Sequence, residues 1–171
     1  QKIIYWRDVP VDSSVLGESV KSNEPCIKQV FIQMGDKISI ENEFERKLYI
    51  IRKQIFRSLQ IHEQKFDDFY IPSLSTRTVV YKGMVLAPNL SKYYLDFKDK
   101  SFKSAMAMFH QRFSTNTFPS WQLAQPFRCL CHNGEINTVN GNINWINSRK
   151  NSTESKILGN NIAKIWPVIE D

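Results

Sequence analysis

The sequence has no long apolar run and few cysteines. No stretch reaches the roughly 18 apolar residues that would predict a membrane-spanning helix. Trp6, Arg7 and Asp8 interrupt the region where a secretory signal would need apolar residues. Three cysteines are an odd number, so they cannot form a complete set of disulfides, and they favour a reducing compartment. We therefore expect neither a membrane protein nor a disulfide-stabilised secreted one.

Basic residues outnumber acidic ones, but they do not gather in one tract. The formal net charge is +6, and Lys and Arg are scattered among acids. The arginine-rich segment that is typical of many nucleic-acid-binding proteins is missing. Nucleic acid is therefore not expected as a partner. A non-catalytic basic binding module stays open as the alternative to an enzyme.

The chain has the features of a piece of a longer protein. It begins at Gln1 rather than Met, and it ends shortly after Trp166 in a stretch with no terminal character. No internal repeat, low-complexity segment or interdomain linker divides it. We expect residues 1–171 to form one incomplete domain that lacks both of its ends. The abundance of Ile, Lys and Asn is typical of AT-rich genomes, which plastids and some bacteria possess.

The clearest predicted element is a helix over residues 43–60. Its apolar residues recur at spacings of three and four and form one stripe, which comprises Phe44, Leu48, Ile51, Ile55 and Leu59. Asn42 can cap the helix, with Glu45 completing a capping box. A basic face follows the acidic first turn, and a solvated face is expected there rather than a membrane or partner surface. This face comprises Arg46, Lys47, Arg52, Lys53 and Arg57.

Alternation of side chains predicts several short strands. Residues 26–34 predict a strand that turns at Gly35-Asp36, after which residues 37–40 are expected to pair with it. Further strands are expected at 76–81, 101–112 and 127–131, and short helices at 88–97 and 140–150. Because strands and helices are mixed without regular βαβ alternation, the sequence favours an α+β fold.

Two of these strands end in polar loops, which makes their ends the expected place for a site. In the first loop, Arg112 can hold a carboxylate through two parallel hydrogen bonds, and Thr115 can add a neutral one. Arg112 can equally pair with a buried acid and serve the structure alone.

The second polar loop contains His132, Asn133 and Gly134. An Asn side-chain amide beside a Gly backbone N–H offers two donors, which can hold an oxygen that becomes negative when an amide is attacked. Asn-Gly is also a common hairpin-turn dipeptide, so a purely structural turn is the competing interpretation.

The cysteines do not predict a metal site. Cys129 and Cys131 are spaced i, i+2, which differs from the C-x₂₋₄-C spacing of zinc sites, and no second cysteine pair follows. We expect both to pack as small hydrophobes, and we assign no role to Cys26.

The tract from Ser73 onward resembles the glutamine amidotransferase domain of glutamate synthases. Three pieces carry the resemblance: SLSTRTVVYKGM at 73–84, HQRFSTNTFPSWQLAQPFR at 110–128 and HNGEINTVNGN at 132–142. The resemblance implies a class II amidotransferase of the N-terminal-nucleophile (Ntn) hydrolase type, with two antiparallel sheets between helix layers in a four-layer αββα fold. It also implies the hydrolysis of glutamine to glutamate and ammonia.

The same resemblance implies roles for individual residues. Arg112 would bind the α-carboxylate of glutamine with Thr115 close by, and Asn133 and Gly134 would form the oxyanion hole. The nucleophile of the family is a cysteine at the mature N-terminus, and Gln1 offers no such group. The acid that holds the substrate amino group is expected beyond Asp171. We therefore expect residues 1–171 alone to have no glutaminase activity.

For the full-length protein, the resemblance implies ammonia transfer to 2-oxoglutarate with electrons from FMN and an iron–sulfur cluster. This chain is expected to bind none of these cofactors and no metal. We expect the ferredoxin-dependent type, located in the plastid or chloroplast stroma, with the bacterial cytoplasm as the alternative. Another class II amidotransferase is the alternative within the same class, although the FSTNTFPSW and NGEINT tracts argue against it.

Overall fold

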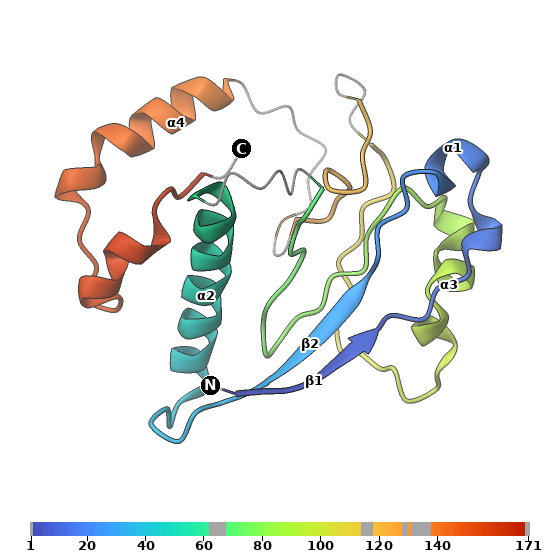
Figure 1. The fold of residues 1–171 in the computed structure, drawn as a ribbon, viewed down its shortest axis with the longest axis horizontal. Helices are drawn as coiled ribbons and strands as arrows, with labels where there is room; N and C mark the ends of the chain where they lie inside the picture. The colour runs from blue at the N-terminus through green and yellow to red at the C-terminus, as the bar shows by residue number, and fades with distance from the viewer. Residues whose placement is uncertain (1, 62–67, 114–117, 128–129, 131–137, 170–171) are drawn as a thin grey trace. The chain divides into compact units, whose positions relative to one another are not determined.

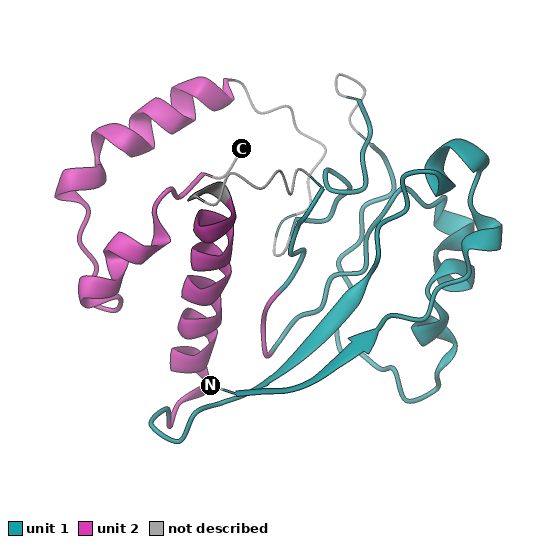
Figure 2. Cartoon of the chain, in the orientation of Figure 1, with its two compact units in different colours: residues 1–38, 68–73, 77–132 teal, residues 39–67, 74–76, 133–171 magenta. Residues whose placement is uncertain are grey.

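A computed structural model describes residues 2–61, 68–113, 118–127, 130 and 138–169. The chain divides into two compact units (Figure 2). Unit 1 comprises residues 1–38, 68–73 and 77–132, and unit 2 comprises residues 39–67, 74–76 and 133–171. Each unit is therefore assembled from segments that are far apart in the sequence.

The sheet of unit 1 is an antiparallel ribbon of two strands, β1 (Lys2–Asp8) and β2 (Lys28–Gln33) (Figure 1). Ile4 is an extra residue in β1, because Ile3 pairs with Ile32 while Tyr5 pairs with Phe31. The strand predicted over residues 26–34 is thus confirmed as β2.

The partner predicted for this strand is wrong. The chain does turn after β2, where the backbone N–H of Ile38 donates to the carbonyl of Gly35 at 2.9 Å. However, residues 37–40 form no strand, and β2 pairs with β1 instead. Two antiparallel strands pair stably when the side chains opposite each other fit together. The alternating residues of β1 provide such side chains for β2, whereas the four residues after the turn do not.

Short helical turns complete the regular structure of unit 1. They are η1 (Ser13–Val15), α1 (Glu18–Lys21), η2 (Ala87–Asn89), α3 (Leu90–Tyr93) and η3 (Leu95–Lys98). The last three confirm the short helix predicted after Pro88. Asp12 caps η1 by accepting from the backbone N–H of Ser14 at 3.0 Å.

The core of unit 1 is aromatic. Tyr93 is fully buried, and its ring lies edge-on to Tyr94 with the ring centroids 4.7 Å apart and 5.8 Å from Trp121. Val9 completes the buried set. Around Tyr81 a second group of rings packs mostly edge-to-face, with centroids 4.9 Å away at Tyr94 and further contacts at Phe97 and Phe102.

Two further predicted strands are wrong. Residues 76–81 and 101–112 are irregular, and the described residues contain no strand that pairs with either segment. Alternation specifies which side chains share a face, but a strand also needs a neighbour for its backbone hydrogen bonds. Near the third predicted strand, Phe127 and Leu130 form a single antiparallel bridge, and residues 128, 129 and 131 lie outside the described residues.

Unit 2 is built on the long helix α2 (Glu41–Ile61), which confirms the strongest prediction from the sequence. Phe44 and Leu48 of the predicted stripe are buried. Because the helix begins at Glu41, Asn42 lies inside its first turn and is not its cap. The Glu45 carboxylate accepts from Ser75 Oγ at 3.0 Å and from Thr76 Oγ1 at 2.6 Å instead of closing a capping box.

The rest of unit 2 consists of α4 (Val139–Ser148), η4 (Lys150–Ser152) and η5 (Gly159–Ile165). Here α4 confirms the helix predicted from Asn140. The prediction of a solvated basic face is wrong for Lys53, which is buried. Its Nζ donates to the carbonyls of Pro167 at 2.7 Å and Val168 at 2.9 Å. None of the helices in the described parts of the chain is long and apolar enough to span a bilayer.

Candidate functional site

Of the four predicted site residues, the structure describes only Arg112. Its side chain is exposed and lies on an irregular segment. Thr115, Asn133 and Gly134 lie outside the described residues, as do Cys129 and Cys131. The oxyanion and threonine assignments therefore stay predictions.

The surroundings of Arg112 differ from those of Arg7. It takes part in no ion pair with another described residue. An arginine that served only the fold would be expected to have its acid within reach, as Arg7 does. The carboxylate-binding role of Arg112 stays a prediction.

The helix that follows the predicted oxyanion turn begins on an unusual residue. Thr138 caps α4 with a left-handed backbone, φ 55°, and its hydroxyl accepts from the backbone N–H of Gly141 at 3.0 Å. A β-branched residue in this region carries backbone strain. A Cβ at Gly141 would lie 3.0 Å from Thr138 Oγ1, so the cap leaves little room for a side chain there. The Asn140-Gly141 pair is thus part of a helix start, although its sequence matches the predicted turn at Asn133-Gly134.

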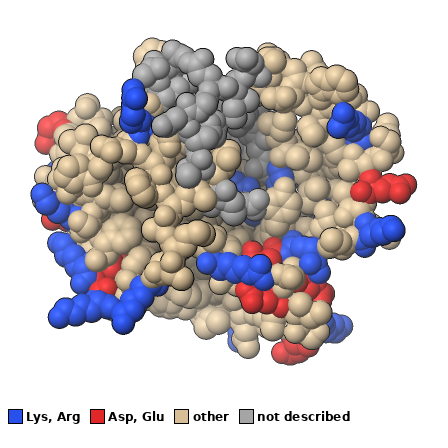
Figure 3. Space-filling view, turned by 180° about the vertical axis from the view of Figure 1, so that it is seen from behind, with Lys and Arg blue, Asp and Glu red and all other residues tan. Residues whose placement is uncertain are grey.

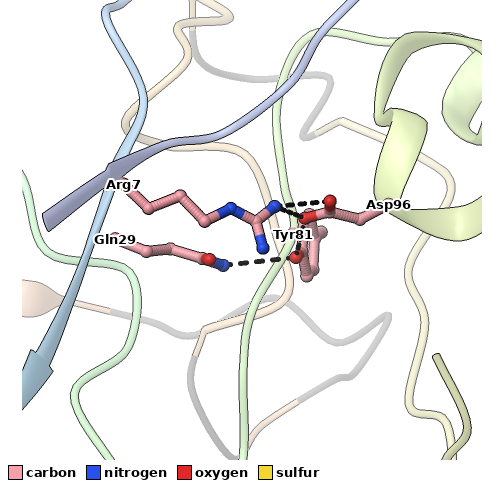
Figure 4. Close-up of polar contacts among 4 residues, drawn as sticks. All are labelled: Arg7, Gln29, Tyr81 and Asp96. Carbon is pink, nitrogen blue, oxygen red and sulfur yellow. Dashed lines mark hydrogen bonds and ion pairs between the residues drawn. The ribbon is translucent and has the colours of Figure 1, made fainter. Parts of the chain in front are cut away.

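A polar cluster in unit 1 was not predicted from the sequence (Figure 4). Arg7 of β1 forms an ion pair with Asp96 of η3, and the Tyr81 hydroxyl donates to the same carboxylate at 2.6 Å. Gln29 of β2 donates to the Tyr81 hydroxyl at 3.2 Å. The hydrogen bond to Asp96 raises the pKa of Arg7, and burial, followed by the bond to Asp96, raises the pKa of Tyr81. No local pattern could reveal this cluster, because its members come from four separate segments.

A second feature missed from the sequence involves Lys82 and Gly83. The buried Lys82 donates from Nζ to the carbonyl of Gln122 at 2.6 Å. The ring of Trp121 lies so close to Gly83 that an added Cβ would overlap it. The pair therefore contacts the segment 118–127 at two consecutive residues. In the sequence, this segment joins the loop of Arg112 and Thr115 to the loop of Asn133 and Gly134.

Unit 2 contains a groove of about 680 Å³. Its described lining combines two cations with polar and apolar groups and comprises Arg57, Lys150, Asn151, Thr153, Ile162, Ala163, Trp166 and Pro167. Arg112 is not among these residues. The groove therefore gives no support to the predicted glutamine site.

Charge and ligand chemistry show no second site among the described residues. On the face drawn in Figure 3, the described basic side chains lie apart from one another or beside acids, rather than in one continuous patch. Across the same described ranges, no three His, Cys, Asp or Glu side chains gather so that they could hold a metal ion. Cys26 is exposed and free.

Comparison with known proteins identifies one family. The family described as class II glutamine amidotransferases matches residues 1–171. The large chain of the NADPH glutamate synthase of Azospirillum brasilense is 45% identical over 98% of this chain and 11% of its own length. The chloroplastic ferredoxin-dependent glutamate synthase 2 of Arabidopsis thaliana is 43% identical over 98% of this chain and 10% of its own.

A further relative gives the same result. The ferredoxin-dependent glutamate synthase of Antithamnion sp. is 45% identical over 97% of this chain and 11% of its own length. The chain thus spans about a tenth of the curated relatives that it matches. These relatives use different electron donors, so similarity over this part does not distinguish between the donors.

Proposed function

The chain belongs to the class II glutamine amidotransferases, and from this we propose that it is the glutamine-hydrolysing part of a glutamate synthase. The observation that carries the proposal is the family match over the whole chain, together with 45% identity to a glutamate synthase large chain. The proposed fold is the four-layer αββα arrangement of Ntn hydrolases, of which the β1–β2 ribbon would be a part. The interspersed charges argue against a basic binding module.

The proposed reaction is the hydrolysis of the glutamine side-chain amide to glutamate and ammonia. The Arg112 guanidinium holds the α-carboxylate of glutamine through two parallel hydrogen bonds, with Thr115 close by. The Asn133 amide and the Gly134 backbone N–H donate to the oxygen that becomes negative when the amide carbon is attacked. The attacking cysteine and the acid that binds the substrate amino group are supplied from outside residues 1–171. Because such groups act as a unit, this piece alone is expected to be inactive.

The ammonia would be consumed by a separate part of the enzyme. We propose that this part adds it to 2-oxoglutarate with electrons that come from ferredoxin. FMN and an iron–sulfur cluster would be held in that separate part, as the resemblance to glutamate synthases implies. The ferredoxin-dependent, chloroplastic relatives support a plastid location, and the bacterial relatives support the cytoplasm as the alternative.

The oxyanion assignment can be tested by replacing Asn133 with Asp in the full-length enzyme. The substitution removes an amide donor and places a negative charge against the developing one. We expect glutamine-dependent kcat to fall on the order of a hundredfold or more, because oxyanion donors act mainly in the transition state. The KM for glutamine should change little, and ammonia-dependent glutamate formation should be retained.

The chain contains a matched control for this experiment. Asn140 also precedes a glycine, and it is exposed in the first turn of α4. Asn140→Asp makes the same chemical change outside the proposed site and should leave glutamine turnover nearly normal. If Asn133→Asp folds and behaves like Asn140→Asp, Asn133 is only a turn residue.

The carboxylate assignment is tested by Arg112→Lys. The substitution replaces the planar guanidinium by a point charge, so about one hydrogen bond to the charged carboxylate should be lost. The KM for glutamine should therefore rise on the order of tenfold. Ammonia-dependent activity should survive, because it bypasses glutamine binding. Arg57→Lys, on the exposed side of α2, is the matched control. An unchanged KM for Arg112→Lys would rule out the carboxylate role.

A further inference from the structure

Lys82 is a buried cation that has no role in the proposed reaction. Its side chain is 8% exposed, and its ammonium donates to the carbonyl of Gln122 at 2.6 Å. The same nitrogen lies 5.2 Å from the ring centroid of Tyr70 and 5.4 Å from that of Phe127. A charge in this position is costly to desolvate, whereas an apolar side chain of similar length would fill the space without that cost. The charge therefore calls for an explanation beyond packing.

The residue beside Lys82 holds the same segment by shape. The Trp121 ring covers Gly83 so closely that no Cβ fits between them, and Trp121 is itself 4% exposed. Trp121 Nε1 also donates to the carbonyl of Val20 at 3.3 Å. On the other side, the buried Tyr94 hydroxyl donates to the carbonyl of Lys82 at 2.7 Å, which fixes the backbone of the pair to the aromatic core.

These contacts are made to the stretch of chain that lies, in the sequence, between the two loops of the proposed site. Lys82 contacts the segment 118–127 at Gln122 and at Phe127, and Gly83 contacts it at Trp121. The segment begins just after the loop of Arg112 and Thr115 and leads to Asn133. It is therefore the stretch of chain that joins the two loops. A displacement of about 1 Å in such a connection can lower a rate by orders of magnitude.

We propose that Lys82 is a positioning residue for glutamine hydrolysis, which acts by fixing segment 118–127 through the Gln122 carbonyl and the Phe127 ring. The inference rests on the proposed function. Lys82 itself would touch no reacting atom. Its cation is retained because a directed hydrogen bond and two ring contacts define one position for the segment, where an apolar side chain would allow several.

The test compares Lys82→Met with Lys82→Arg in the full-length enzyme. Met keeps the length and packing of the side chain but removes the donor and the charge, while Arg retains both. The readouts are kcat and KM with glutamine, the rate with ammonia, and the fraction of sites titrated by an electrophilic glutamine analogue. Lys100→Met, at an exposed position of the same unit, is the matched control.

We expect Lys82→Met to lower the glutamine-dependent kcat per titrated site on the order of tenfold or more. Its ammonia-dependent rate should match that of the parent enzyme, and Lys82→Arg should recover most of the loss. A purely structural role would lower the number of titrated sites but leave turnover per site unchanged, and that result would overturn the proposal. So would normal turnover in Lys82→Met.

A milder variant keeps the proposal testable if Lys82→Met does not fold. Phe127→Leu retains apolar bulk and removes only the aromatic face next to the ammonium, so a smaller loss of kcat per titrated site, roughly twofold to fivefold, is expected. An unchanged kcat would count against the proposal. Failure of the proposed function gives a different result, because the parent enzyme itself would then release no ammonia from glutamine.

Discussion

The two units of the chain are stabilised by different kinds of contact. Unit 1 is held by packed rings, with Tyr93, Tyr94 and Trp121 at its centre. The hydroxyl or indole N–H of each of these rings donates a hydrogen bond. The Tyr93 hydroxyl donates to Glu24 at 2.6 Å, for example, and Trp121 Nε1 donates to the carbonyl of Val20. Most of the stability of such a core comes from apolar area removed from water.

Unit 2 relies more on long polar side chains that reach backbone carbonyls. From α2, Lys53 donates to Pro167 and Val168, and Gln54 donates to the carbonyl of Lys164 at 2.6 Å. These bonds hold η5 and the irregular chain after it against the helix. A segment without regular structure can thus be held by directed hydrogen bonds from long polar side chains.

The largest effect that would test this comparison is expected from Tyr93→Ala. Removal of a fully buried ring should lower the free energy of local unfolding in unit 1 by about 3–5 kcal/mol. Hydrogen exchange of the α3 amides in the full-length protein measures it. Phe118→Ala, which truncates a ring that is 94% exposed, is the control and should change little. A loss in Tyr93→Ala no larger than in this control would contradict an aromatic core.

A smaller effect is expected from Lys53→Met in unit 2. The substitution keeps the apolar stem but removes the donor to two carbonyls, which should cost about 1–3 kcal/mol. Exchange of the η5 amides should become faster, while the α3 amides of unit 1 keep their protection. Lys47→Met, at an exposed position of the same helix, serves as control. Normal protection of η5 would show that packing alone holds this segment.

The smallest effect concerns alkaline pH and belongs to unit 1. Burial raises the pKa of Tyr93 and also that of Tyr94. Each group therefore stabilises the folded state fully below the pKa of an unfolded tyrosine, and this stability is lost as pH rises above it. The linkage predicts a loss of about 1.4 kcal/mol per pH unit for each tyrosine above roughly pH 10.

Tyr93→Phe isolates this contribution. The variant loses the hydrogen bond to Glu24 at every pH, so the informative quantity is the slope of stability against pH rather than its value at neutrality. That slope should become shallower in the alkaline range when α3 exchange is followed. An equal slope in the parent and the variant would mean that Tyr93 ionises as it does in the unfolded chain.

Prediction from the sequence succeeded where structure depends on neighbours along the chain. The period of apolar residues located α2, and the strand at residues 26–34 was found from its alternation. It failed where a backbone partner had to be supplied from elsewhere, as at residues 76–81 and 101–112. For the site, the structure describes Arg112 as exposed, and the roles of Thr115, Asn133 and Gly134 stay predictions.

The sequence by itself determined the family of the chain and the positions of its main helices. Motifs and helix periods are local, so they can be recognised without knowing what they pack against. Only the tertiary structure decided that Lys53 is buried, that Asp96 joins Arg7 to Tyr81, and that Lys82 binds the carbonyl of Gln122. The physical reason is that the residues next to a long polar side chain in the sequence do not determine which group it will bind. Its environment is set by whichever distant segment the fold brings within reach of its donors.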